Sequence, residues 1–202
     1  MELWVEGKDD EMVCKSILEK HGLSSSYVVI NKGGYPNLKI GLKTQLKADF
    51  TTLGLIVDAD HDPAARWQSL RDIIHKHDPA YGLPKKLPPQ GFWSSHAPSI
   101  GIWIMPDNQR SGMLEDFIRD LIPQDNALLP EADASLSRIE ALGIQQYVPV
   151  HRTKALIHTW LAWQEEPGML MSSTISKHML ATASPLYQYF LAWLQRFSDP
   201  TS

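Results

Sequence analysis

The chain has 202 residues, of which 43% are hydrophobic and 21% are charged, and its formal net charge is −4. This composition is typical of a globular protein with a hydrophobic core and excludes global intrinsic disorder. The acidic balance argues against a protein that coats nucleic acid non-specifically, because such binding depends on Lys and Arg displacing counterions. It does not exclude a nuclease that meets phosphates through metal ions.

The sequence also indicates the cellular compartment in which the protein is expected. The longest apolar runs, Leu53–Val57 and Ile100–Met105, are far shorter than the roughly 18 residues that a membrane-spanning helix needs. The first residues are acidic and are not followed by an apolar stretch, so we expect no secretory signal. The single cysteine, Cys14, cannot form an internal disulfide. We therefore expect a cytoplasmic protein without a membrane partner.

Strand-like and helix-like segments alternate along the first part of the chain. The predicted strands are short apolar runs: Leu3–Glu6, Tyr27–Ile30, Leu53–Val57 and Ile100–Met105. The predicted helices have apolar residues at helical spacing, and each follows a strand: Asp10–His21, Pro36–Lys47, Pro63–His77 and Leu114–Ile122. Residues 79–99 are rich in proline and are predicted to form a loop or an irregular hairpin.

The order of these segments predicts an α/β fold. We expect a mainly parallel four-stranded sheet flanked by helices, with right-handed crossovers. Further helices are predicted at Ala132–Leu142, Thr153–Gln164 and Leu186–Phe197. We therefore divide the chain into an α/β domain at residues 1–125 and a helical C-terminal extension at residues 126–202, packed together as one structural unit. Ligand sites of such sheets lie where the parallel strands end.

Five acidic residues are predicted to gather at this edge. Glu6 ends the first strand and Asp10 begins the helix after it, whereas Asp58 and Asp60 end the third strand and Glu115 follows the fourth. Mg²⁺ prefers carboxylate oxygens, and two ions about 3.5–4 Å apart can activate water and stabilise the leaving oxygen in phosphodiester cleavage. The set predicts a site for one or two Mg²⁺ or Mn²⁺ ions. Alternatively, Asp10 and Asp60 only cap helices.

The motifs around these residues resemble the TOPRIM domain of topoisomerases, bacterial primases, 5S ribosomal RNA maturase and the overcoming-lysogenisation-defect nucleases. The segment Val5-Glu6-Gly7 is similar to the TOPRIM strand-end glutamate motif, and Asp58-Ala59-Asp60 is similar to its D-x-D motif. Over nearly the whole chain the sequence resembles the TOPRIM-related DUF3226 proteins, through Gly101–Asn108 and Gly112–Glu115. The resemblance implies a TOPRIM-like, Rossmann-like fold.

The resemblance also implies roles for single residues. Glu6 is similar to the TOPRIM glutamate, which is assigned as a metal ligand or general acid/base. Asp58 and Asp60 resemble the metal-binding pair of TOPRIM domains. Asp10 and Glu115 resemble the additional ligands of the two-metal nucleases.

A later lysine completes the nuclease pattern. Lys154 is the candidate for this lysine, which could stabilise charge that develops on phosphate. The alternative is that Lys154 is a solvated helix residue. Met113 stands where the nucleases often carry a serine, and this departure leaves the second metal site open.

Histidines and tryptophans add little to this pattern. Of the eight histidines, only His61 lies beside the acidic residues in the sequence. Trp160, Trp163 and Trp193 recur among leucines at helical spacing and are predicted to lie in the core. Trp93, in the proline-rich segment, is the one candidate for stacking on an unpaired base.

Two functions from different classes fit the sequence. The first is a Mg²⁺- or Mn²⁺-dependent nuclease acting on DNA or RNA, in which Glu6 and Lys154 are catalytic. The alternative is a non-catalytic TOPRIM-like module that binds a metal or a partner protein, as part of a defence or toxin system. A homodimer stays open in both cases. A third interpretation retains only the fold, with the acidic residues as helix caps.

Overall fold

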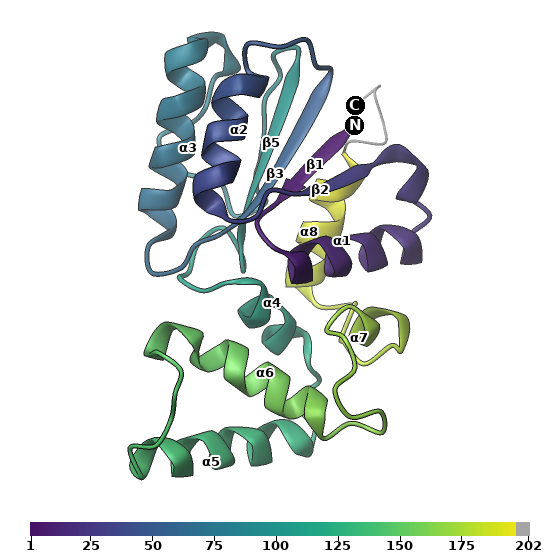
Figure 1. Ribbon diagram of the computed structural model, residues 1–202. Helices are drawn as coiled ribbons and strands as arrows, with labels where there is room; N and C mark the ends of the chain where they lie inside the picture. Colours follow the sequence, from purple (N-terminus) through teal and green to yellow (C-terminus); the bar gives the residue numbers. More distant parts are fainter. Residues whose placement is uncertain (197–202) are drawn as a thin grey trace.

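The computed structural model describes residues 1–196, which form an α/β fold with a five-stranded, mostly parallel sheet flanked by helices (Figure 1). The strands are β1 (Glu2–Val5), β2 (Val28–Asn31), β3 (Thr52–Asp58), β4 (Phe92–Trp93) and β5 (Ser99–Met105). Their order is β2-β1-β3-β5-β4, and only β4 runs antiparallel to its neighbour. The prediction of four strands omitted β4, because two residues are too few for a strand pattern to be recognised.

Helices of the first part of the chain cover both faces of the sheet. Their bounds are α1 (Lys8–Lys20), α2 (Tyr35–Gln45), α3 (Pro63–His77) and α4 (Leu114–Leu121). Figure 1 shows α2 and α3 on one face, with α1 and the C-terminal helix α8 (Pro185–Gln195) on the other. No helix in the described part of the chain is long and apolar enough to cross a membrane.

Alternation along the strands separates two hydrophobic clusters. Leu3 and Val5 of β1 point toward α1 and α8, whereas Trp4 between them points toward α2 and α3. Successive side chains of a strand lie on opposite faces, so a sheet with helices on both faces needs apolar residues in both registers. This is why β3 and β5 are continuous apolar runs, as the sequence predicted.

The remaining helices lie beyond the edge where the parallel strands end (Figure 1). They are α5 (Leu128–Ala141), α6 (Arg152–Ala162) and the short α7 (Ser173–Ser176), which the sequence did not predict. The Arg152 guanidinium, at the start of α6, binds Asp133 and Glu140 of α5 at 2.6 and 2.9 Å. The predicted end of the last helix, Phe197, lies outside the described residues.

Helix α6 is also attached to α4. The Thr153 hydroxyl donates a hydrogen bond to Oδ1 of Asp116 at 2.9 Å. One hydrophobic cluster contains Leu3, Phe117 and Trp160, which lie on both sides of residue 125. The division at that residue stays a prediction.

The tryptophans divide between core and surface. Trp160 and Trp193 are buried, as predicted, but the prediction for Trp163 was wrong, because 43% of this residue is exposed. Trp163 follows the last turn of α6, where the apolar spacing no longer faces the core. Trp93 is partly buried, with its ring centroid 5.2 Å from that of Trp193.

Candidate metal centre

Two of the predicted ligands, Glu6 and Asp58, lie side by side at the ends of β1 and β3. Glu6 follows the last residue of β1, and its Oε1 accepts a hydrogen bond from the backbone amide of Asp58 at 3.0 Å. Oδ1 of Asp58 in turn accepts a hydrogen bond from the amide of Leu114, at the start of α4, at 3.0 Å. The ends of β1 and β3, together with the start of α4, therefore fix both carboxylates at one edge of the sheet.

Asp10 is the most constrained acidic residue of α1. It is only 6% exposed, and its Oδ2 accepts a hydrogen bond from the Gly7 amide at 3.0 Å. Its Oδ1 is buried and has no hydrogen-bond partner among the described residues. Helix capping, the alternative for Asp10, thus accounts for one carboxylate oxygen but not for the other. A buried oxygen without a partner is costly, and it fits a site that a cation completes.

Burial and mutual repulsion raise the pKa values of this group. Burial raises the pKa of Glu6 to about 7, although Arg66 opposes the shift. Burial, followed by the charge of Glu115, raises the pKa of Asp10 to about 6. The pKa of Asp58 lies well above its ordinary value, because of burial and then of the other four predicted ligands. All five carboxylates therefore belong to one electrostatic neighbourhood.

Asp60 is the most accessible of the five. Its side chain is 47% exposed and forms an ion pair with Arg66, which also lies 4.0 Å from Oε1 of Glu6. Asp60 does not cap α3, since Asp62 accepts the hydrogen bond from the Ala65 amide. The capping alternative for Asp60 was therefore wrong. The sequence did not reveal Arg66, although it lies one turn into the helix that follows the D-x-D motif.

Glu115 joins the acidic edge to the helical extension. It is 3% exposed and lies on the first turn of α4. Nζ of Lys154, on α6, is 2.8 Å from Oε1 of Glu115 and 3.7 Å from Oδ2 of Asp9. Although burial lowers it, the hydrogen bond to Glu115 leaves the pKa of Lys154 above its ordinary value. Lys154 is therefore ion-paired with the acidic residues, although 45% of its side chain is exposed.

Two neighbours of Lys154 were missed by sequence analysis. One ligand atom each from Asp9, Glu115 and His158 lie within 4.8 Å of one another. In the sequence only His61 lies beside the acidic residues, but the fold brings α6 to α4 and so places His158 beside Glu115. His158 is four residues after Lys154, so helical spacing would have placed both side chains on one face.

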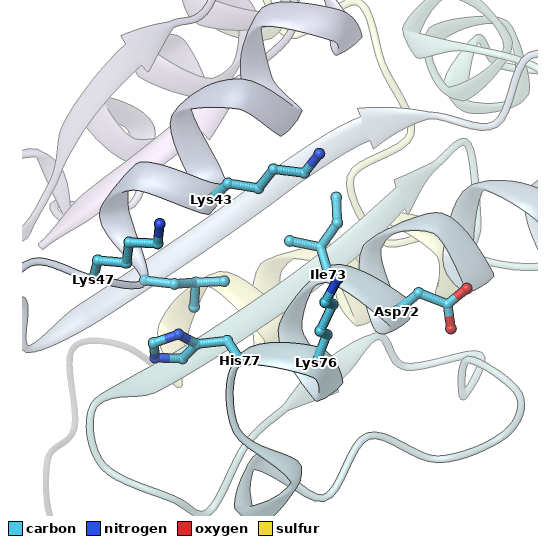
Figure 2. Close-up of a pocket in the computed structure, with 7 residues that line it drawn as sticks. Lys43, Lys47, Asp72, Ile73, Lys76 and His77 are labelled. Carbon is cyan, nitrogen blue, oxygen red and sulfur yellow. The ribbon is translucent and has the colours of Figure 1, made fainter.

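A pocket elsewhere on the molecule does not involve these residues. Figure 2 shows it at the ends of α2 and α3, where it is lined by Lys43, Lys47, Asp72, Lys76 and His77, together with two apolar side chains. Both helices return toward the amino ends of the strands, so this pocket lies at the edge opposite the acidic residues. Basic residues there complement the helix C-termini.

Comparison with known protein families confirms the resemblance to the DUF3226 proteins. A family model described as a protein of unknown function (DUF3226) matches residues 1–199. The chain belongs to the DUF3226 family. No curated protein and no solved structure matches it. In this DUF3226 member the acidic centre comprises Glu6, Asp10, Asp58, Asp60 and Glu115, with Arg66 and Lys154 as its cationic neighbours.

Proposed function

We propose that this protein is a metal-dependent phosphodiesterase that cleaves DNA or RNA at the acidic centre. One observation carries the proposal. Glu6, Asp10 and Asp58 are gathered in a buried site, and Oδ1 of Asp10 has no partner among the described residues. Burying several carboxylates together is unfavourable unless a cation compensates them.

The donor set fits Mg²⁺ or Mn²⁺. Glu6, Asp10, Asp58, Asp60 and Glu115 offer the hard oxygen ligands that these ions prefer and would hold one or two of them. When bound, such an ion supplies Lewis-acid stabilisation of the charge that develops on a phosphate. The similarity of Val5-Glu6-Gly7 and Asp58-Ala59-Asp60 to TOPRIM motifs supports the same chemistry.

The chain's own residues have separable roles. Without a bound ion, burial raises the pKa of Glu6 to about 7, so this carboxyl can take up or release a proton near neutral pH, and as a ligand of a bound ion it would be ionised. The amide of Asp58 orients Oε1 of Glu6. Lys154 retains its positive charge and can stabilise a phosphate oxygen at the same edge.

The proposal is tested by a cleavage assay. Single- and double-stranded DNA and RNA would each be incubated with the protein in Mg²⁺, Mn²⁺ or EDTA. We expect cleavage of at least one substrate with metal, none in EDTA, and loss of cleavage in Asp58→Asn. The exposed Asp125→Asn is the matched control, and it should cleave like the wild type. Cleavage by Asp58→Asn at the wild-type rate would overturn the proposal.

A second function is a non-catalytic module that binds a metal or a partner. Its support is that Arg66 already neutralises Asp60, and Lys154 already neutralises Glu115. In this case Mg²⁺ or Mn²⁺ raises the melting temperature of the wild type, but none of the four nucleic-acid substrates is cleaved. The same samples therefore distinguish the two functions.

A further inference from the structure

Helix α6 presents two functional side chains to the acidic centre. Lys154 and His158 are four residues apart and therefore lie on one face of the helix. Across from this face are Asp9 on α1 and Glu115 on α4, and the ligand atoms of these two residues lie within 4.8 Å of each other and of a His158 ring nitrogen. Three elements that are distant in sequence thus bring two carboxylates and an imidazole together.

This spacing is close to that of ligands on a shared ion. Two ligand atoms about 2.1 Å from one ion are at most about 4.2 Å apart. For three atoms around one ion the mutual distances are shorter still, and side-chain rotations of about an ångström would bring the three atoms to such distances. Asp9 is half-buried and His158 is exposed, so both can rotate, whereas the buried Glu115 stays fixed.

The buried Asp10 beside this site also indicates an excess of negative charge. Asp10 is adjacent to Asp9 on α1 and is nine-tenths buried. Its Oδ1 has no partner among the residues described, and the charge of Glu115 acts directly on its carboxylate. The negative charge at this end of the centre therefore exceeds what the Lys154 ammonium compensates.

We propose that Asp9, Glu115 and His158 bind a divalent transition-metal ion, with Mn²⁺ as the ion to test. An imidazole nitrogen suits transition metals, whereas Mg²⁺ prefers oxygen ligands throughout. The inference deepens the proposed function and rests on it, since Glu115 and the neighbouring Asp10 belong to the acidic centre. The helical extension supplies His158, so the site is complete only when α6 is docked on α4.

Lys154 has a specific place in this site. Its ammonium lies 2.8 Å from Oε1 of Glu115 and 3.7 Å from Oδ2 of Asp9, so it occupies the region between two of the three ligands. A divalent ion must displace it or bind beside it, at a cost from like-charge repulsion. Removing the ammonium should therefore strengthen binding of the ion, which is the opposite of what removing a ligand does.

The test measures binding of Mn²⁺ alone, not activity. Free Mn²⁺ is followed by electron paramagnetic resonance during titration of the protein in excess Mg²⁺. We expect the wild type to retain Mn²⁺, His158→Ala to weaken its binding by about tenfold or more, and Lys154→Met to strengthen it. The control His75→Ala removes an exposed histidine from α3 and should bind as the wild type does.

Two outcomes would overturn the inference. One is Mn²⁺ binding by His158→Ala that equals that of His75→Ala, and the other is weaker binding by Lys154→Met. Since His158 is exposed, its substitution leaves the fold intact, which circular dichroism verifies. Asp58→Asn separates this inference from the proposed function: it should abolish cleavage while Mn²⁺ bound through His158 is retained in excess Mg²⁺.

Discussion

The backbone amide of Asp58 donates a hydrogen bond to Oε1 of Glu6 at 3.0 Å, and this contact joins the end of β3 to the end of β1. It lies just past the last paired residues of the two strands, which are Trp4 and Leu55. The side chain of Glu6 thus replaces a missing ladder hydrogen bond and is held at the edge of the sheet. Asp58 makes a second link through its own carboxylate to the Leu114 amide.

Asp58→Asn should stabilise the protein in the absence of metal. Asparagine retains the oxygen that accepts from Leu114 but removes a charge that is buried among other carboxylates. At pH 8 in EDTA we expect the free energy of unfolding to rise by about 1–3 kcal/mol, measured by urea denaturation. A decrease would show that the ionised carboxylate is favourable without metal.

Metal should offset the stability advantage that Asp58→Asn has over the wild type in EDTA. An ion at about 100 times its dissociation constant stabilises the wild type by about 2.7 kcal/mol. We expect thermal denaturation with Mg²⁺ or Mn²⁺ to show this increase in the wild type and a much smaller one in Asp58→Asn. Equal increases in both proteins would place the bound ion away from Asp58.

The pH dependence of stability without metal should run opposite to that of a salt-bridged carboxylate. The pKa of Glu6 rises from its ordinary value of 4.5 to about 7 on folding, so the folded state binds more protons between these values. Its contribution is fully present below pH 4.5 and is lost as the pH rises through 7. The loss is about 3 kcal/mol for Glu6 alone.

Urea denaturation in EDTA between pH 4.5 and 8 measures this dependence. Stability should fall with rising pH in the wild type, and the slope should flatten in Glu6→Gln. Saturating Mg²⁺ or Mn²⁺ should also flatten it, because the ion favours the ionised carboxylates. If the stability of the wild type rose with pH over this range, the raised pKa of Glu6 in the folded state would be contradicted.

Much of this centre followed from chain order. Glu6 and Asp58 could be placed together because the ends of adjacent parallel strands share an edge, and buried parallel strands have a strong sequence pattern. The partners of those residues could not be found in this way. Arg66 and His158 reach the centre through the packing of α3 and α6, which no local periodicity specifies. The strand β4 was missed because it is only two residues long.

Arg66 should stabilise the folded state mainly through charge. Its guanidinium pairs with Asp60, lies 4.0 Å from Oε1 of Glu6 and stacks 3.7 Å from the centroid of the Tyr35 ring. We expect Arg66→Met to reduce the free energy of unfolding by about 1–3 kcal/mol at pH 8 in EDTA. The loss should be smaller at pH 5, where Glu6 is protonated.

Urea denaturation at the two pH values isolates the contribution of the Glu6 charge. A loss of the same size at pH 5 and pH 8 would attribute the effect to the Asp60 ion pair and to packing against Tyr35. Arg71→Met is the control, since Arg71 is on the same helix and its Nε donates to the Leu83 carbonyl 3.4 Å away.

Gly101 should be essential to the edge of the sheet formed by β4 and β5. A Cβ at this position would overlap the indole of Trp93, which is the residue paired with Gly101 across the two strands. Trp93 also packs against Trp193 of α8, with the ring centroids 5.2 Å apart, which restricts the room for its indole to move. Gly101→Ala should therefore cost about 1–3 kcal/mol of stability through overpacking.

In Trp93→Leu the ring is absent, and adding Gly101→Ala to that variant should cost less than it does in the wild type. Urea denaturation of the four proteins measures this coupling, and strictly additive losses would mean that the glycine is needed for its backbone and not for the space above it.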